Sequence, residues 1–153
     1  MLLKTVRSVN LLLAGTLAGN EFGTWAAVHP AVEELSPAER LRAEQALTRR
    51  FGAIMPAWMG AALASSFAAA LLSRGSAGFR PTFFGALCFA AMLASTRLGN
   101  VPINDRTLKL TEDDIEEFGR LRDRWGRLHT LRVALTTVGL AALISGALAG
   151  GER

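Results

Sequence analysis

The sequence lacks several features on which soluble proteins commonly depend. It contains no tyrosine, and its single cysteine, Cys88, lies inside an apolar run. One cysteine excludes an intrachain disulfide framework and a cysteine-rich zinc site, and it leaves the redox compartment open. Charge is sparse as well, because 20% of the 153 residues are charged, whereas a soluble domain carries about 25%.

Charged residues are missing altogether from three long stretches, which cover 51–73, 81–96 and 133–151. Such blocks exclude an intrinsically disordered chain and argue against an ordinary soluble enzyme. The net charge of +4 does not indicate nucleic acid as a partner. Basic and acidic residues are interleaved, as in Arg122-Asp123-Arg124, so no continuous basic stripe forms.

The apolar stretches predict an all-α fold, namely a four-transmembrane-helix bundle in a single domain over 1–153. The predicted spans are about 9–28, 51–72, 81–98 and 131–150. The second has about 22 uncharged residues, which is enough to cross a bilayer. The third is shorter, and flanking arginines whose side chains reach the lipid headgroups extend it. Membrane lipids are therefore expected partners, in the inner or plasma membrane of the cell.

The first span has two interpretations. Its basic start, short apolar region and following small residues fit a cleaved signal peptide. Apolar character resumes from Phe22 to Val28, which favours a helix that is retained in the protein. The span also contains Asn10, Asn20 and Glu21, so it carries polar side chains into the predicted membrane.

The second and fourth helices are predicted to extend beyond the bilayer on one side. Ser36-Pro37-Ala38-Glu39 is a capping box with proline at the first helical position, so a helix that begins there can run into the second span. The acidic run Thr111-Glu112-Asp113-Asp114 begins the fourth helix similarly. The long connections then share one side of the membrane, opposite the termini and the turn 73–80. The overall count of lysine and arginine places the long connections on the cytoplasmic side, whereas Lys4 and Arg7 place the N-terminus there. The orientation of the protein in the membrane therefore stays open.

A carboxylate inside the first span needs a partner or a function. Burial of Glu21 there costs about 2.5–3.5 kcal/mol on insertion scales, so its side chain should face the bundle interior or a polar cavity. Trp25 and His29 follow at intervals of four residues, and the three side chains are predicted to share one helix face. Glu21 is interpreted either as a functional group or as a structural carboxylate paired with an arginine of another helix.

A second polar cluster follows a helical spacing into the fourth span. Its members recur at intervals of four and three residues, so they form one stripe. They are Phe118, Arg122, Trp125, His129 and Arg132. An ordinary core stripe would carry leucine or valine, so this composition favours a functional site. The alternative is an interfacial belt of tryptophan and arginine at headgroup level. Three further arginines fall on other faces of the helix: Arg120, Arg124 and Arg127.

The third polar feature is the segment Asn100-Val101-Pro102-Ile103-Asn104, which follows the third span. Pro102 is predicted to end the helix and to hold Val101 in an extended conformation, so the two asparagines would lie in a fixed turn. The topology places this turn on the same side as His29 and His129. We therefore expect a pocket that opens on that side, with Glu21 at its floor and histidine, arginine and asparagine at its mouth.

These motifs resemble those of a known family. The run Asn100-Val-Pro-Ile-Asn104, followed by Arg124-Trp125, His129 and Arg132, resembles the anthrone oxygenase-like integral membrane proteins. The segment 14–23 with His29-Pro30-Ala31 is similar to that family's first helix. The resemblance covers nearly the whole chain and implies a four-helix membrane protein. It also implies oxidation of anthrones to anthraquinones by O2, without an added cofactor.

The residues and the resemblance together suggest an oxidoreductase, a monooxygenase that acts on a lipophilic aromatic or phenolic substrate. His129 would be the base that forms an electron-rich enolate or phenolate. Arg132 and Arg122 would stabilise the oxyanion, with Glu21 as a further catalytic candidate. The substrate-binding candidates, which would orient oxygen atoms or stack on the ring, are Asn100, Asn104, Trp25 and Trp125.

Two alternatives involve different chemistry. A haem-binding membrane protein would use His29 or His129 as axial ligand to haem b and arginines for the propionates. A non-catalytic bundle would assemble with partners, or with further copies of itself, through helix faces of small residues. Two histidines and one deep carboxylate are not a specific metal signature, so no metal site is predicted.

Overall fold

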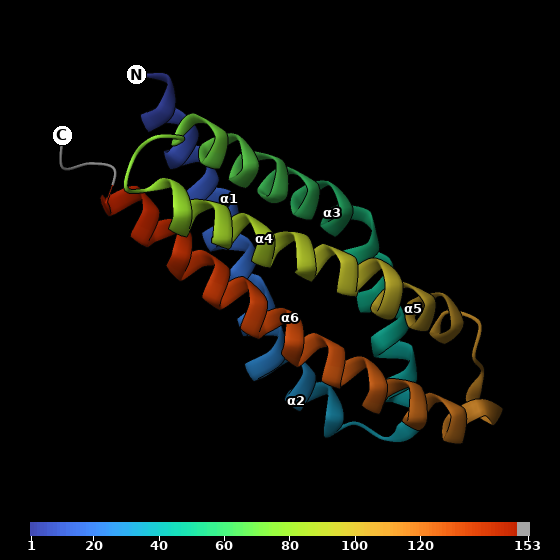
Figure 1. Ribbon diagram of the computed structural model, residues 1–153. Helices are drawn as coiled ribbons and strands as arrows, with labels where there is room; N and C mark the ends of the chain where they lie inside the picture. Colours follow the sequence, from blue (N-terminus) through green and yellow to red (C-terminus); the bar gives the residue numbers. More distant parts are fainter. Residues whose placement is uncertain (150–153) are drawn as a thin grey trace.

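The computed structural model describes residues 1–149, and helices make up nearly all of that part of the chain (Figure 1). Its α-helices are α1 Leu2–Gly23, α2 His29–Glu33, α3 Pro37–Leu72, α4 Phe79–Ser95, α5 Val101–Thr107 and α6 Ile115–Ala149. Wide π-helical turns at Thr24–Val28 and Thr96–Asn100 join α1 to α2 and α4 to α5, and a 3-10 turn at Glu112–Asp114 precedes α6. No strand occurs within residues 1–149, so the predicted all-α class is confirmed.

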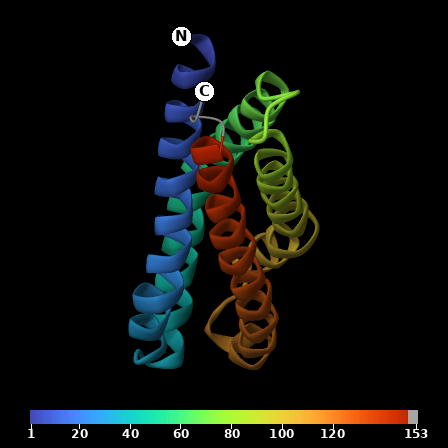
Figure 2. The ribbon, with the colours of Figure 1, turned by 60° about the vertical axis from the view of Figure 1, so that its left-hand side comes forward.

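The described residues form four helical rods that pack side by side. α1 continues into α2 and α4 into α5, while α3 and α6 are uninterrupted over 36 and 35 residues. α1 packs against α3 and α6, and α4 packs against the same two helices (Figure 2). The N-terminus, the turn between α3 and α4 and the end of α6 lie at one end of the molecule (Figure 1). The long connections therefore share the opposite end, as the sequence predicts.

The two long helices begin where the sequence predicts a start. Ser36 and Glu39 form the capping box of α3, with Pro37 at the first helical position. Thr111 and Asp114 form a second capping box before α6. Each box satisfies amide groups that the first turn of a helix leaves without an intrahelical partner.

The apolar core lies between α1, α3, α4 and α6. Its buried members are Ala14, Leu17, Met55, Met59, Ala62, Phe89, Met92 and Leu143. α4 and α6 approach each other closely, because a Cβ atom on Gly85 would lie 2.8 Å from the backbone oxygen of Gly139. Small residues at such a contact let two backbones come together, as they do in packed membrane helices.

The prediction that Pro102 ends the third helix is wrong. Asn100–Asn104 is helical, and Val101 has φ −59° and ψ −48° instead of an extended conformation. The proline lies in the first turn of α5, directly after the wide turn Thr96–Asn100. A proline inside a regular α-helix loses one hydrogen bond and clashes with the preceding turn, so the wide turn directly before Pro102 is what accommodates it in a continuing rod.

Within residues 1–149, three helices are long and apolar enough to cross a membrane: Pro37–Leu72, Phe79–Thr107 and Glu112–Ala149. The α1 rod is not one of them. Its polar residues lower the mean hydropathy, because Asn10, Asn20 and Glu21 interrupt its apolar run. The structure therefore supports three of the four predicted spans by length and composition.

Candidate functional site

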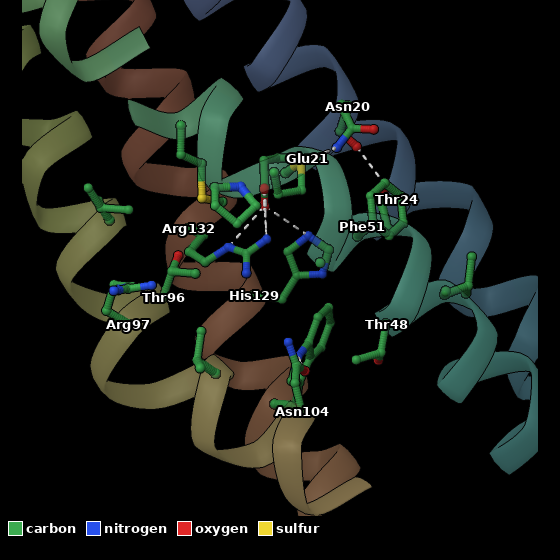
Figure 3. Close-up of a pocket in the computed structure, with 18 of the residues that line it drawn as sticks. Asn20, Glu21, Thr24, Thr48, Phe51, Thr96, Arg97, Asn104, His129 and Arg132 are labelled. Carbon is green, nitrogen blue, oxygen red and sulfur yellow. Dashed lines mark hydrogen bonds and ion pairs between the residues drawn. The ribbon is translucent and has the colours of Figure 1, made fainter. Parts of the chain in front are cut away.

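A cavity of about 400 Å³ lies among the four rods, and side chains from all of them line it (Figure 3). Its size falls within the range of small-molecule sites, about 300–1,000 Å³. α3 supplies an apolar wall that consists of Leu47, Phe51, Met55, Pro56 and Met59. α1 and α6 supply charged and polar groups opposite this wall, and Arg97 and Thr96 line it from the turn after α4.

The deepest polar cluster is the Glu21 triad, which we define as Glu21, His129 and Arg132. Arg132 Nη2 donates to both carboxylate oxygens of Glu21 at 2.7 and 2.6 Å, and its Nε donates at 3.1 Å. His129 Nε2 lies 3.2 Å from Glu21 Oε2. Glu21 and His129 are 1% and 2% exposed. A bidentate arginine is the strongest partner that a buried carboxylate can have, so the expected interhelical pairing of Glu21 is present.

A second cluster, the Glu44 triad, consists of His29, Glu44 and Arg122. His29 Nδ1 lies 3.2 Å from Glu44 Oε1, and Arg122 Nε lies 3.0 Å from the same oxygen. All three residues are buried. Each triad therefore joins a histidine to a carboxylate that an arginine of α6 holds.

Glu44 is the functional candidate that sequence reasoning misses. It stands in the charged start of α3, where alternating acids and bases are typical of a solvated surface. A signal was nevertheless present, because Leu41, Glu44, Thr48, Phe51 and Met55 recur at intervals of three and four. Such spacing indicates a single inward face, and it continues the cavity wall of α3 toward Glu44.

Glu44 and Arg122 lie outside the charge-free stretches of the sequence. Burial tends to raise the pKa of Glu44, but the hydrogen bond from His29 and the charge of Arg122 hold that pKa below its usual value. Burial lowers the pKa of Arg122, and the charge of Glu44 opposes that shift. Glu44 is therefore ionised near neutral pH and can only accept hydrogen bonds.

Trp125 connects the two triads. Its ring centroid lies 4.8 Å from that of His29 and 4.7 Å from that of His129, and the two imidazoles are 5.2 Å apart in an edge-to-face arrangement. The Arg122 guanidinium lies 4.3 Å from the indole. The indole nitrogen donates to Asn104 Oδ1 at 2.8 Å. Both histidines thus face one aromatic surface at the cavity wall.

The π-helical turn at Thr24–Val28 explains why His29 meets His129. In a regular α-helix, eight residues leave His29 about 80° away from Glu21 around the axis. A π turn takes more residues to complete each rotation, so both side chains point inward. The same change turns Trp25 outward, where it is 43% exposed and donates to Thr130 Oγ1 at 3.1 Å. The prediction that Trp25 shares the face of Glu21 and His29 is therefore wrong.

The remaining predicted site residues are placed as follows. Asn104 lines the cavity beside Trp125. Asn100 is fully buried behind it, and its Nδ2 lies 3.5 Å from the backbone oxygen of Trp125. Arg122 lines a second, much smaller cavity together with Glu44. The three arginines predicted on other faces of α6, Arg120, Arg124 and Arg127, are exposed.

No group of three or more histidine, cysteine, aspartate or glutamate side chains in residues 1–149 is arranged to hold a metal ion. The two triads together contain two carboxylates, two guanidiniums and two imidazoles. Such a set can bind a polar oxygen, stabilise a negative charge and transfer protons.

A family model described as anthrone oxygenase matches residues 45–142. The matched range includes Asn104, Arg122, Trp125, His129 and Arg132, whereas the carboxylates and His29 precede it. Comparisons with curated proteins and with solved structures find no match.

Proposed function

The chain belongs to the anthrone oxygenase family, and we propose that it oxidises a lipophilic aromatic substrate of the anthrone type with O2. The cavity carries this proposal. Its wall on α3 is apolar and suits a fused aromatic ring, whereas the opposite wall holds the buried Glu21 triad. Small-molecule sites are typically apolar pockets in which a small number of polar groups point toward the ligand.

All four rods are proposed to cross the membrane, with the starts of α3 and α6 extending beyond it. Three of them contain helices that are long and apolar enough to cross a membrane. α1 supplies Ala14 and Leu17 to the same core, and Arg132 neutralises Glu21, the acidic residue that makes α1 less apolar. The cavity would then open near one membrane surface, where a lipophilic substrate can enter from the bilayer.

The proposed chemistry starts with removal of a proton from the substrate. An anthrone has a methylene group whose deprotonation gives an electron-rich enolate, and this anion can reduce O2 directly. His129 is the proposed base. His129 Nε2 lies 3.2 Å from Glu21 Oε2 and has no hydrogen-bond partner within residues 1–149, so it can take up a proton that the adjacent carboxylate then stabilises. An imidazole that a carboxylate orients in this way suits proton transfer near neutral pH.

Other lining residues take supporting roles. Arg132 lies at the cavity wall and would stabilise the developing oxyanion of the enolate. Trp125 would stack on the substrate ring. Asn104 uses its Oδ1 to accept from Trp125, so its amide hydrogens remain to orient a substrate oxygen. Arg122 does not line this cavity, and its proposed contribution passes through Glu44.

The test is O2 consumption and quinone formation by the purified protein in detergent micelles, with an anthrone as substrate. We expect His129→Ala to lower the turnover by about 100-fold or more, the usual effect of losing a general base. Arg127→Ala is the matched control on the same helix, because Arg127 is exposed. Wild-type turnover in His129→Ala would overturn the role of His129. Failure of the wild type to exceed the protein-free rate would overturn the proposed function.

Haem binding is the second candidate, and one observation favours it. His29 Nε2 is buried and has no hydrogen-bond partner within residues 1–149, so this nitrogen could act as an axial ligand. The absorption spectrum of protein expressed with ample haem, before and after reduction with dithionite, decides the matter. A Soret band that His29→Ala removes would support haem, whereas a featureless visible spectrum would reject it.

A further inference from the structure

The imidazole of His29 has one nitrogen in use and one free. Its Nδ1 lies 3.2 Å from Glu44 Oε1, and because the ionised carboxylate only accepts, Nδ1 carries the hydrogen. Its Nε2 is buried without a hydrogen-bond partner within residues 1–149, and the residue is 8% exposed and lines the cavity. An imidazole held by a carboxylate at one nitrogen is oriented to transfer a proton at the other.

Oxidation of an anthrone by O2 needs more than one proton transfer. In the first stage, a methylene proton moves to the base and the electron pair of the carbon reduces O2. The new C–O bond gives a peroxide anion, which takes that proton back. In the second stage, the other methylene proton moves to the base, the carbonyl forms, the O–O bond breaks and hydroxide leaves. Hydroxide then needs a proton to become water, at a time when the first base is already occupied.

We propose that His29, held by Glu44, is this second proton-transfer residue. In the scheme His29 begins as the imidazolium, with one hydrogen on Nδ1 toward Glu44 and a second on Nε2. It donates the Nε2 proton to the departing hydroxide, while His129 removes the protons from carbon. The proton left on His129 then replaces the one lost by His29, so both residues return to their starting states. The sum is one substrate and one O2 converted to one quinone and one water. This inference rests on the proposed function.

Three observations support the division of roles. The two imidazole rings are 5.2 Å apart, so both can reach one bound substrate. They are held by separate carboxylates, which lets one be protonated while the other is neutral. The Glu21 triad is the more deeply buried, whereas Glu44 also lines a second cavity of about 10 Å³ with Thr48 and Arg122. That volume holds about one water molecule, which would connect His29 to protons outside.

Glu44 acts in this scheme as a positioning residue. It fixes the orientation of His29 and stabilises the protonated imidazole, and Arg122 holds the carboxylate from its other side at 3.0 Å. If the ion pair were merely structural, removing Glu44 would change folding and substrate binding. It would not slow O–O cleavage while leaving carbon deprotonation unchanged. The two steps can be measured separately, because deprotonation needs no O2.

The experiment therefore has an anaerobic and an aerobic part. Under argon in D2O, exchange of the anthrone methylene hydrogens reports the base alone. In air, quinone and substrate hydroperoxide are quantified, and protein-free rates are subtracted from both parts. The variants are His29→Gln, which keeps a polar side chain beside Glu44, His129→Ala, and Asp123→Asn as an exposed control on α6.

We expect His29→Gln to exchange deuterium within about twofold of the wild type, to form quinone about 100-fold more slowly, and to release hydroperoxide. Glu44→Gln should show the same split with a smaller loss of quinone formation. His129→Ala should lose both reactions, and Asp123→Asn neither. Added imidazole should restore quinone formation in His29→Ala, which also tests the role if His29→Gln folds poorly.

Two results would overturn the inference while leaving the proposed function intact. The first is loss of exchange and quinone formation to the same extent in His29→Gln, with no rescue of His29→Ala by imidazole. The second is full quinone formation in His29→Gln. If the wild type itself fails to oxidise an anthrone above the protein-free rate, the proposed function fails, and this inference fails with it.

Discussion

The two triads have the same composition but hold their carboxylates differently. In the Glu21 triad both carboxylate oxygens accept from Arg132, whereas in the Glu44 triad His29 and Arg122 approach the single oxygen Oε1. Glu21 lies within the predicted span of α1, whereas Glu44 lies in the charged start of α3, near the end with the long connections. A carboxylate far from water must have all its hydrogen-bonding capacity satisfied, because an unpaired charge is costly to bury.

The largest difference in stability between the triads should appear when the arginine of each triad is replaced. Arg132→Met leaves Glu21 buried without a countercharge, and we predict a loss of about 3–5 kcal/mol in the free energy of unfolding. Denaturant-induced unfolding in micelles measures it, with Arg127→Met as the exposed control that should change stability by less than about 0.5 kcal/mol. An equal effect of the two substitutions would contradict the importance of the Glu21–Arg132 pair.

The corresponding change in the other triad should cost less. Arg122→Met removes the ion-pair partner of Glu44, but the nearby small cavity allows water to approach the carboxylate. We predict a loss of about 1–3 kcal/mol, the usual cost of leaving one buried polar group without its partner. The same unfolding measurement applies. A loss as large as that of Arg132→Met would show that the two carboxylates are equally shielded from water. That result would contradict the proposed difference between the triads.

Acid should weaken the Glu44 triad in a defined direction. The pKa of Glu44 is held below its usual value of 4.5, so its contribution to stability is complete above that value and is lost as the pH falls through the lowered pKa. The groups that face it are His29, Arg122 and Arg40. We predict that the stability difference between the wild type and Glu44→Gln shrinks between about pH 5 and pH 3. A difference that stays constant over this range would contradict the ion pair.

The smallest effect is expected at the residue that joins the triads. Trp125→Phe keeps an aromatic ring between the histidines but removes the hydrogen bond to Asn104 Oδ1. We predict a loss of about 0.5–1.5 kcal/mol in the free energy of unfolding, the net value of one such bond. Asn104→Leu should have a comparable effect, and the double variant should cost less than the sum of both, because the two residues share one interaction. Strict additivity would show that they are not coupled.

The Glu21 triad was within reach of the sequence, and the Glu44 triad was not. A carboxylate in an apolar helix demands a cationic partner, and the stripe through His129 and Arg132 offers one, so hydropathy and spacing were enough. Glu44 is one of several charged residues at the start of α3. Which of these side chains is buried depends on tertiary packing, which the sequence does not show. Its position on the inward face of α3 was the one available signal.

The local errors have a common cause in the π-helical turns. Each turn changes the rotation of the helix, which moves Trp25 outward and His29 inward, and allows Pro102 to lie inside a continuing rod. Such turns follow from contacts with neighbouring helices and have no clear sequence signature. Capping boxes, by contrast, depend on residues a few positions apart, so the starts of α3 and α6 were predictable.

The most direct test of the proposed oxygenase is isotopic. Purified protein is incubated with an anthrone under ¹⁸O2, and the quinone is analysed by mass spectrometry against a protein-free sample and His129→Ala. We predict one ¹⁸O atom in each quinone formed by the wild type, at a rate that His129→Ala lowers by about 100-fold. A quinone that contains no ¹⁸O, or a rate of formation that the protein does not raise, would contradict oxygenation in this cavity.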